Sequence, residues 1–108
     1  IDEGLAQRLR EALGGARVTE RKMFGGIAFM SRGHMFVGIA KQRLMVRVGP
    51  AAYDDALRKP HVREMDFTGR PLRGYVYVDA EGIERDEDLA EWVGAGLAFV
   101  GTLPAKQR

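Results

Sequence analysis

The sequence predicts an α+β domain, a two-layer fold in which helices pack on an antiparallel sheet. Helical periodicity marks both ends of the chain, strand-like alternation fills the middle, and glycines or prolines separate the segments. The expected order is α-β(3)-α-β(2)-α. A length of 108 residues suits one domain over residues 1–108, with its core in about 18–103.

The first element is an amphipathic helix over residues 2–13. It carries leucines at i, i+4 and i+8: Leu5, Leu9 and Leu13. Gly14 and Gly15 are expected to end it, because glycine readily takes the left-handed conformation that follows a helix.

Three strands are expected next, over residues 27–30, 35–40 and 43–48. Gly33 suits a hairpin turn between the first two strands, and apolar residues alternate with Met45 and Arg47 in the third. The strand-like residues that follow Gly25-Gly26 favour a bulge or a close backbone approach inside the first strand.

The second half predicts a short helix over residues 50–60, strands over 62–67 and 72–79, and a final helix. Asp86 is the expected N-cap of this last helix, Leu103-Pro104 ends it, and the remaining tail is expected to fray.

The amino-acid composition excludes several classes of function. The chain has no cysteine, which excludes disulfides, thiolate catalysis and cysteine-based metal sites, and fits a cytoplasmic protein. Its apolar runs are shorter than the roughly 20 residues of a membrane helix. Net charge is +2, yet residues 17–73 hold 12 Lys and Arg against 5 Asp and Glu, whereas residues 74–91 hold one Arg against 7 acids.

No sequence motif clearly indicates a phosphate-binding, metal-binding or catalytic site. The segment MFGGIAFM lacks the spacing of a P-loop or a dinucleotide fingerprint, and no helix follows it. The two histidines, His34 and His61, have no second ligand nearby in the sequence. Ser31 lies close to His34 in a hairpin, but no acid in that segment would orient the histidine. We therefore expect no catalytic residue, metal or cofactor.

Basic residues on or between the first strands form a candidate contact surface for an acidic partner. This predicted basic face comprises Arg21, Lys22, Lys41, Arg43 and Arg47.

Taken together, four segments resemble the TfoX N-terminal domain family: RKMFGGIAFM, GHMFVGIAKQRLMVRVGP, REMDFTGRPLRGYVYVD and DEDLAEWV. The resemblance runs from about Val18 to Leu103. The family motif residues, which we interpret as structural, are Met23, Phe24, Gly25, Gly26, Gly69, Arg70, Pro71, Leu72, Arg73 and Gly74. Met23 or Phe24 is expected to fill the core between helix and sheet.

The resemblance implies a bacterial, cytoplasmic, non-enzymatic domain with the same order of elements and no established catalytic residues. The family includes the N-terminal half of a competence regulator and many stand-alone proteins. The first hypothesis is therefore a regulatory module that binds a protein partner or forms a homo-oligomer, without contact to a membrane. A nucleic-acid-binding domain that uses the basic face is the second, and a small-molecule-binding protein or an enzyme is the third.

Overall fold

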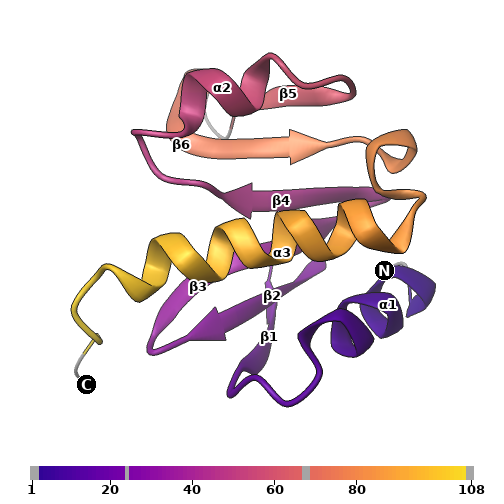
Figure 1. Ribbon diagram of the computed structural model, residues 1–108, viewed down its shortest axis with the longest axis vertical. Helices are drawn as coiled ribbons and strands as arrows, with labels where there is room; N and C mark the ends of the chain where they lie inside the picture. The colour runs from indigo at the N-terminus through magenta and orange to yellow at the C-terminus, as the bar shows by residue number, and fades with distance from the viewer. Residues whose placement is uncertain (1–2, 24, 67–68, 107–108) are drawn as a thin grey trace.

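The computed structural model describes residues 3–23, 25–66 and 69–106. Its elements, labelled in Figure 1, are α1 (Glu3–Leu13), β1 (Thr19–Met23), β2 (Gly26–Ser31), β3 (His34–Ala40), β4 (Arg43–Arg47), α2 (Tyr53–Leu57), β5 (Val62–Asp66), β6 (Pro71–Val78), the 3-10 helix η1 (Ala80–Ile83) and α3 (Asp86–Gly101).

The strands form one six-stranded antiparallel sheet in the order β1-β2-β3-β4-β6-β5. The helices α1, α2 and α3 pack on one face of this sheet, and α3 runs across its middle (Figure 1). The predicted α+β class, its two layers and the order of helix, strands, helix, strands, helix are confirmed. We call the face without helices the open face.

The first group of strands has one member more than expected. Residues 19–23 form β1, which pairs with β2 from Thr19↔Met30 to Met23↔Gly26. Alternation does not reveal this strand, because four of its residues are exposed and the fifth is half-buried, as an edge strand allows.

Gly25 therefore lies in the turn that precedes β2, and Gly26 is the first residue of β2. Gly25 adopts a φ of +75° beside the Met23↔Gly26 pair. Gly26 does make the close approach that its sequence context favoured. An added Cβ there would lie 1.9 Å from the carbonyl oxygen of Ile39.

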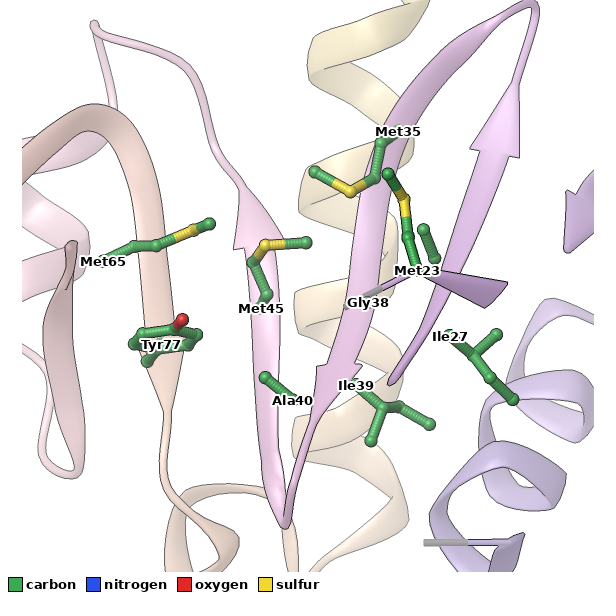
Figure 2. A pocket seen from close by; sticks show the side chains of 10 residues that line it. Met23, Ile27, Met35, Gly38, Ile39, Ala40, Met45, Met65 and Tyr77 are labelled. Carbon is green, nitrogen blue, oxygen red and sulfur yellow. The ribbon is translucent and has the colours of Figure 1, made fainter. Parts of the chain in front are cut away.

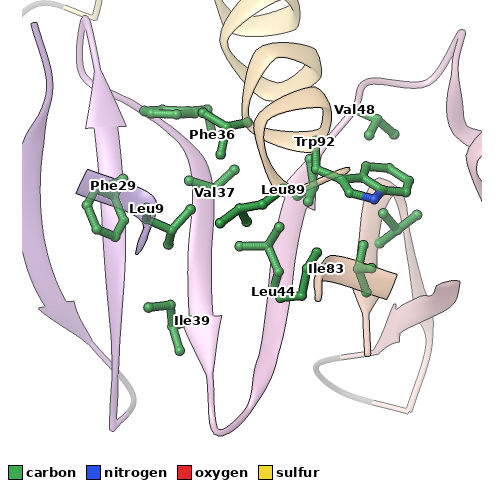
Figure 3. Packing of buried hydrophobic residues seen from close by; sticks show 14 of the residues in the cluster. Leu9, Phe29, Phe36, Val37, Ile39, Leu44, Val48, Ile83, Leu89 and Trp92 are labelled. Atoms are coloured by element: carbon green, nitrogen blue, oxygen red, sulfur yellow. The ribbon is translucent and has the colours of Figure 1, made fainter. Parts of the chain in front are cut away.

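The core fills the space between the sheet and the helices (Figure 3). Leu9 of α1 and Leu89 of α3 are almost fully buried against Phe29, Val37 and other strand residues. Leucines at helical spacing thus form the buried stripe that the sequence predicted. Among the described residues, no helix is long and apolar enough to cross a membrane.

Two helix ends test the capping predictions. Gly14, with a φ of +57°, follows α1 as expected. Asp86 is not the N-cap of α3, because Arg85 holds that position and makes no side-chain cap. The Asp86 carboxylate instead accepts a hydrogen bond from Arg8 Nη2 at 3.1 Å, which joins α3 to α1.

The C-terminal tail was expected to fray, but it is bonded to the rest of the fold as far as Lys106. His34 Nε2 lies 2.7 Å from the carbonyl oxygen of Pro104, and the amide of Lys106 donates to the carbonyl oxygen of Arg32 at 2.9 Å. The tail is thereby attached to the β2–β3 hairpin, whose turn holds Arg32 and Gly33 at positive φ.

The two adjacent glycines predict different mutational costs. Gly26→Ala should destabilise the fold by about 3 kcal/mol, since its Cβ would overlap backbone that cannot move away cheaply. Gly25→Ala should cost about 1 kcal/mol, since its Cβ meets open space and only the positive φ is unfavourable. Urea unfolding measures both.

Gly94→Ala is the control, because Gly94 lies in α3 with nothing within 4 Å of an added Cβ. It should stabilise the protein by up to about 1 kcal/mol. Equal losses at Gly25 and Gly26 would show that Gly26 is not confined by the Ile39 carbonyl.

Candidate functional site

A shallow apolar pocket of about 100 Å³ lies on the open face of the sheet. Four of the chain's five methionines line it, one from each of four strands: Met23, Met35, Met45 and Met65. Figure 2 shows their side chains on the side of the sheet away from α3. We call this pocket the methionine groove.

Glycine and tyrosine complete its floor. A Cβ added at Gly38 would lie 2.8 Å from the terminal methyl of Met45 and 3.1 Å from the carbonyl oxygen of Ile27. The missing side chain of Gly38 therefore makes room for Met45. Tyr77 of β6 is the cross-strand partner of Met45 and also lines the groove.

The methionines that line the groove differ in exposure. Met65 is 1% exposed and Met45 is 9% exposed, although no helix covers this face. Met23 and Met35 are half-buried. Methionine side chains are flexible and polarisable, so they adapt to the shape of an apolar partner.

Cations flank the groove. The guanidinium of Arg43 lies 4.0 Å from the centre of the ring of Tyr77, which lines the groove. Arg47 lies farther along β4, with its guanidinium 5.4 Å from the Tyr75 ring and 5.3 Å from the ring of Phe99 in α3. Arg21 is the cross-strand partner of Ala28, which lines the groove. Stacking on the rings fixes Arg43 and Arg47 in place and leaves their charge available to a partner.

The structure separates the residues of the predicted basic face. Arg21, Arg43 and Arg47 belong to the open face by register. Lys22 is the next residue after Arg21 in β1 and points to the helix-covered face, since successive strand residues alternate. Lys41 lies in the turn between β3 and β4 with a φ of +60°. Use of these residues for contact stays a prediction.

The first family motif lies at the β1–β2 hairpin. Met23 lines the methionine groove and does not fill the core between helix and sheet, so the expectation that Met23 or Phe24 fills it rests on Phe24 alone. Phe24 lies outside the described residues. Gly25 and Gly26 shape the turn and the close approach to β3.

The second motif connects β5 and β6 and kinks β6. The amide of Gly69 donates to Asp66 Oδ1 at 2.7 Å, while Arg70 and Pro71 are exposed beside it. Gly74 has a φ of +95°, and its carbonyl oxygen accepts hydrogen bonds from the amides of residues 48 and 49 at 2.8 and 3.0 Å. This kink ties β6 to the end of β4.

Arg73, in the same motif, reaches α2. Its guanidinium lies 3.6 Å from Asp54 and 5.2 Å from the centre of the Tyr53 ring. It is thus on the helix-covered side, away from the methionine groove.

The hairpin histidine binds the C-terminal tail. Ser31 and His34 are cross-strand neighbours, but Nε2 of His34 is engaged with the carbonyl oxygen of Pro104. A carbonyl oxygen only accepts, so Nε2 carries the proton and holds the tail. In the described part of the chain, no group of three or more His, Cys, Asp or Glu side chains gathers around a metal-sized space.

The methionine groove was not predicted from the sequence. Its signal was present in strands 27–30 and 35–40, where apolar residues continue without alternation, a pattern of burial on both faces. The alternation of Arg43, Met45 and Arg47 also placed a methionine between two cations.

These observations define a small two-layer α+β domain whose helices cover one face of the sheet and whose other face presents an apolar, cation-flanked groove. The chain belongs to the TfoX N-terminal domain family, whose model matches residues 9–100. The match begins in α1, ends in α3 and includes every strand. A comparison with curated proteins finds no significant match.

Tyr53, the aromatic neighbour of Arg73, gives a pH-dependent prediction. Its side chain is 4% exposed, and its hydroxyl donates to Glu64 Oε2 at 3.3 Å. Burial, followed by the negative charge of Glu64, raises the pKa of Tyr53 above its ordinary value of about 10. The folded state therefore keeps this proton to higher pH than the unfolded state, and stability is lost as pH rises above about 10.

Tyr53→Phe should remove this component. Urea unfolding at pH 8 and pH 10.5 should show a larger loss of stability in the wild type than in the variant. At pH 8 the variant should differ by about 1 kcal/mol, the size of one hydrogen bond. Equal losses on going to pH 10.5 would contradict the assignment to Tyr53.

Proposed function

We propose that the chain is a cytoplasmic, non-enzymatic regulatory module that binds a protein partner through the open face of its sheet. The observation that carries this proposal is the gathering of four methionines in one groove on the face without helices. Apolar surface that the fold itself leaves uncovered is a common feature of interaction sites.

The size of the groove favours side chains of a partner over a small ligand. Pockets for drug-sized ligands usually hold about 300–1,000 Å³, whereas the methionine groove holds about 100 Å³. That space suits one or two apolar anchors inserted from a larger surface, as in many protein interfaces.

The positive charge near the groove favours an acidic partner. Arg21 and Arg43 lie next to residues that line the groove, and Arg47 lies farther along β4. None of the three forms an ion pair with another described residue. A segment with apolar side chains and nearby Asp or Glu residues complements this arrangement, while a basic segment is repelled. We therefore commit to an acidic, amphipathic segment of another protein as the occupant.

Methionine methyl groups provide a direct test. With only five methionines, ¹³C-methyl labelling gives five assignable signals. Two synthetic peptides serve as probes, one of leucine and glutamate and one in which lysine replaces every glutamate. The glutamate peptide should shift the signals of Met23, Met35, Met45 and Met65, and the lysine peptide should not.

A matched pair of variants tests the role of charge. Arg43→Glu should raise the Kd of the glutamate peptide at least tenfold, or about 1.4 kcal/mol, because it places a repulsive charge beside the groove. Lys22→Glu changes the charge equally on the opposite face and should leave the Kd nearly unchanged. Circular dichroism verifies that both variants fold.

Three outcomes would contradict the proposal. The methionine signals could ignore both peptides, respond equally to both, or shift with protein concentration alone, which would identify a second copy of the chain as the occupant. In the native host, a co-purifying protein supports the proposal only if Arg43→Glu loses it and Lys22→Glu retains it.

A further inference from the structure

A second cleft, of about 670 Å³, lies where the α1–β1 connection, the β2–β3 turn, α3 and the C-terminal tail meet. Four cations from separate segments line it: Arg17, Arg21, Arg32 and Lys106. Thr19 and Ser31, two residues with hydroxyl side chains, line it as well. We call it the basic cleft.

Its positive charge is not compensated within the fold. None of the described residues that line the cleft is an aspartate or glutamate. The four cations form no ion pair with any described carboxylate. Like charges around one space repel each other, and the fold keeps them together without an internal counter-charge.

The nearest carboxylate in sequence, that of Glu20, does not line the cleft and is paired with a different cation. Glu20 lies between Thr19 and Arg21 in β1, so it points to the helix-covered face. There Arg10 binds it through two hydrogen bonds, of 2.7 and 2.8 Å. This bond to Arg10 also lowers the pKa of Glu20, so Glu20 stays ionised and paired at neutral pH.

Backbone contacts fix two of the cations. Arg32 Nη1 donates to the carbonyl oxygen of Val100 at 2.9 Å, which leaves its other guanidinium nitrogens free to donate. The Lys106 amide donates to the Arg32 carbonyl oxygen, and His34 binds the tail two residues earlier, at the carbonyl oxygen of Pro104. The cleft is therefore assembled before any ligand arrives, which lowers the entropic cost of binding.

We propose that the basic cleft binds a phosphate group, carried either by a small phosphorylated molecule or by a nucleic-acid backbone. Phosphate brings up to two negative charges and several acceptor oxygens, which suit guanidinium forks and hydroxyl donors better than a single carboxylate does. The volume exceeds that of the phosphate alone, so there is room for the group that carries it. This proposal does not depend on the methionine groove.

Thermal unfolding and calorimetry test the chemistry. The probes are inorganic phosphate, ATP and a short single-stranded oligonucleotide, each compared with chloride at equal ionic strength. Phosphate and ATP, or the oligonucleotide, should raise the Tm of the full chain above the chloride value. An equal effect of chloride would overturn the proposal, because it would show screening of the four cations and no bound group.

Neighbouring residues on β1 supply the matched variants. Arg21→Gln should weaken binding of the effective probe about tenfold, as expected for the loss of a charge-assisted bond. Lys22→Gln removes the same charge from the opposite face and should bind like the wild type. Arg17→Gln is a second variant on a different segment with the same expected loss, so failure of one variant to fold does not end the test. Wild-type affinity in both cleft variants would overturn the proposal.

The probes also distinguish the source of the phosphate. Saturable binding of ATP at least as tight as that of the oligonucleotide identifies a small phosphorylated ligand. Binding of the oligonucleotide that is much tighter and falls steeply with salt identifies a nucleic-acid backbone. Both results retain the phosphate site, and neither decides whether the peptide binds the methionine groove.

Discussion

The close contact between α3 and β3 is the constraint on which the rest of the structure depends. A Cβ at Gly96 would lie 2.7 Å from the carbonyl oxygen of Phe36, so only glycine lets the helix backbone approach the strand this closely. With α3 held there, Arg8 of α1 donates to the carbonyl oxygen of Ile83 at 2.7 Å and aligns α1 beside it. Both helices are thereby committed to the same face of the sheet.

A consequence is that the other face has no helix to cover it. Apolar strand residues left in water cost about 25 cal/mol per Å², and the open face reduces that cost with its own side chains. Met45 and Met65 are buried within this face, and the guanidinium of Arg43 covers the Tyr77 ring at 4.0 Å from its centre. What remains uncovered is the accessible part of the methionine groove, next to Met23 and Met35. Because flexible side chains of the sheet cover much of the open face, the domain is stable without a partner and these side chains can still rearrange around one.

The sequence predicted the elements whose signals are local. The spacing of leucines predicted α1, the alternation of apolar residues predicted β4, and Gly33 predicted the β2–β3 turn. The prediction missed β1, because an exposed edge strand of charged residues has no apolar face to reveal its period. Because β1 was not predicted, the sequence did not indicate that the side chains of Arg21 and Lys22 point to opposite faces of the sheet. That follows only when both residues are known to lie in a strand.

The candidate sites were harder to predict than the fold for a related reason. Arg43 and Arg47 belong to one alternating segment, so the sequence alone implies that they leave β4 in the same direction. The methionine groove takes its residues from all six strands, and the basic cleft joins Arg17 to Lys106 across nearly the whole chain. Such sets depend on strand order and on how the tail is attached, and neither leaves a local pattern in the sequence.

The two proposed sites share one residue, and this links them physically. Arg21 lines the basic cleft, and its cross-strand partner Ala28 lines the methionine groove. A phosphate held by Arg21 offsets part of the positive charge that attracts an acidic partner to the groove. The two ligands then weaken each other's binding by the same factor, as linkage requires. Because Arg43 and Arg47 lie beyond the cleft on β4, the coupling is partial, so a phosphate-bearing ligand would tune the affinity for a protein partner without abolishing it.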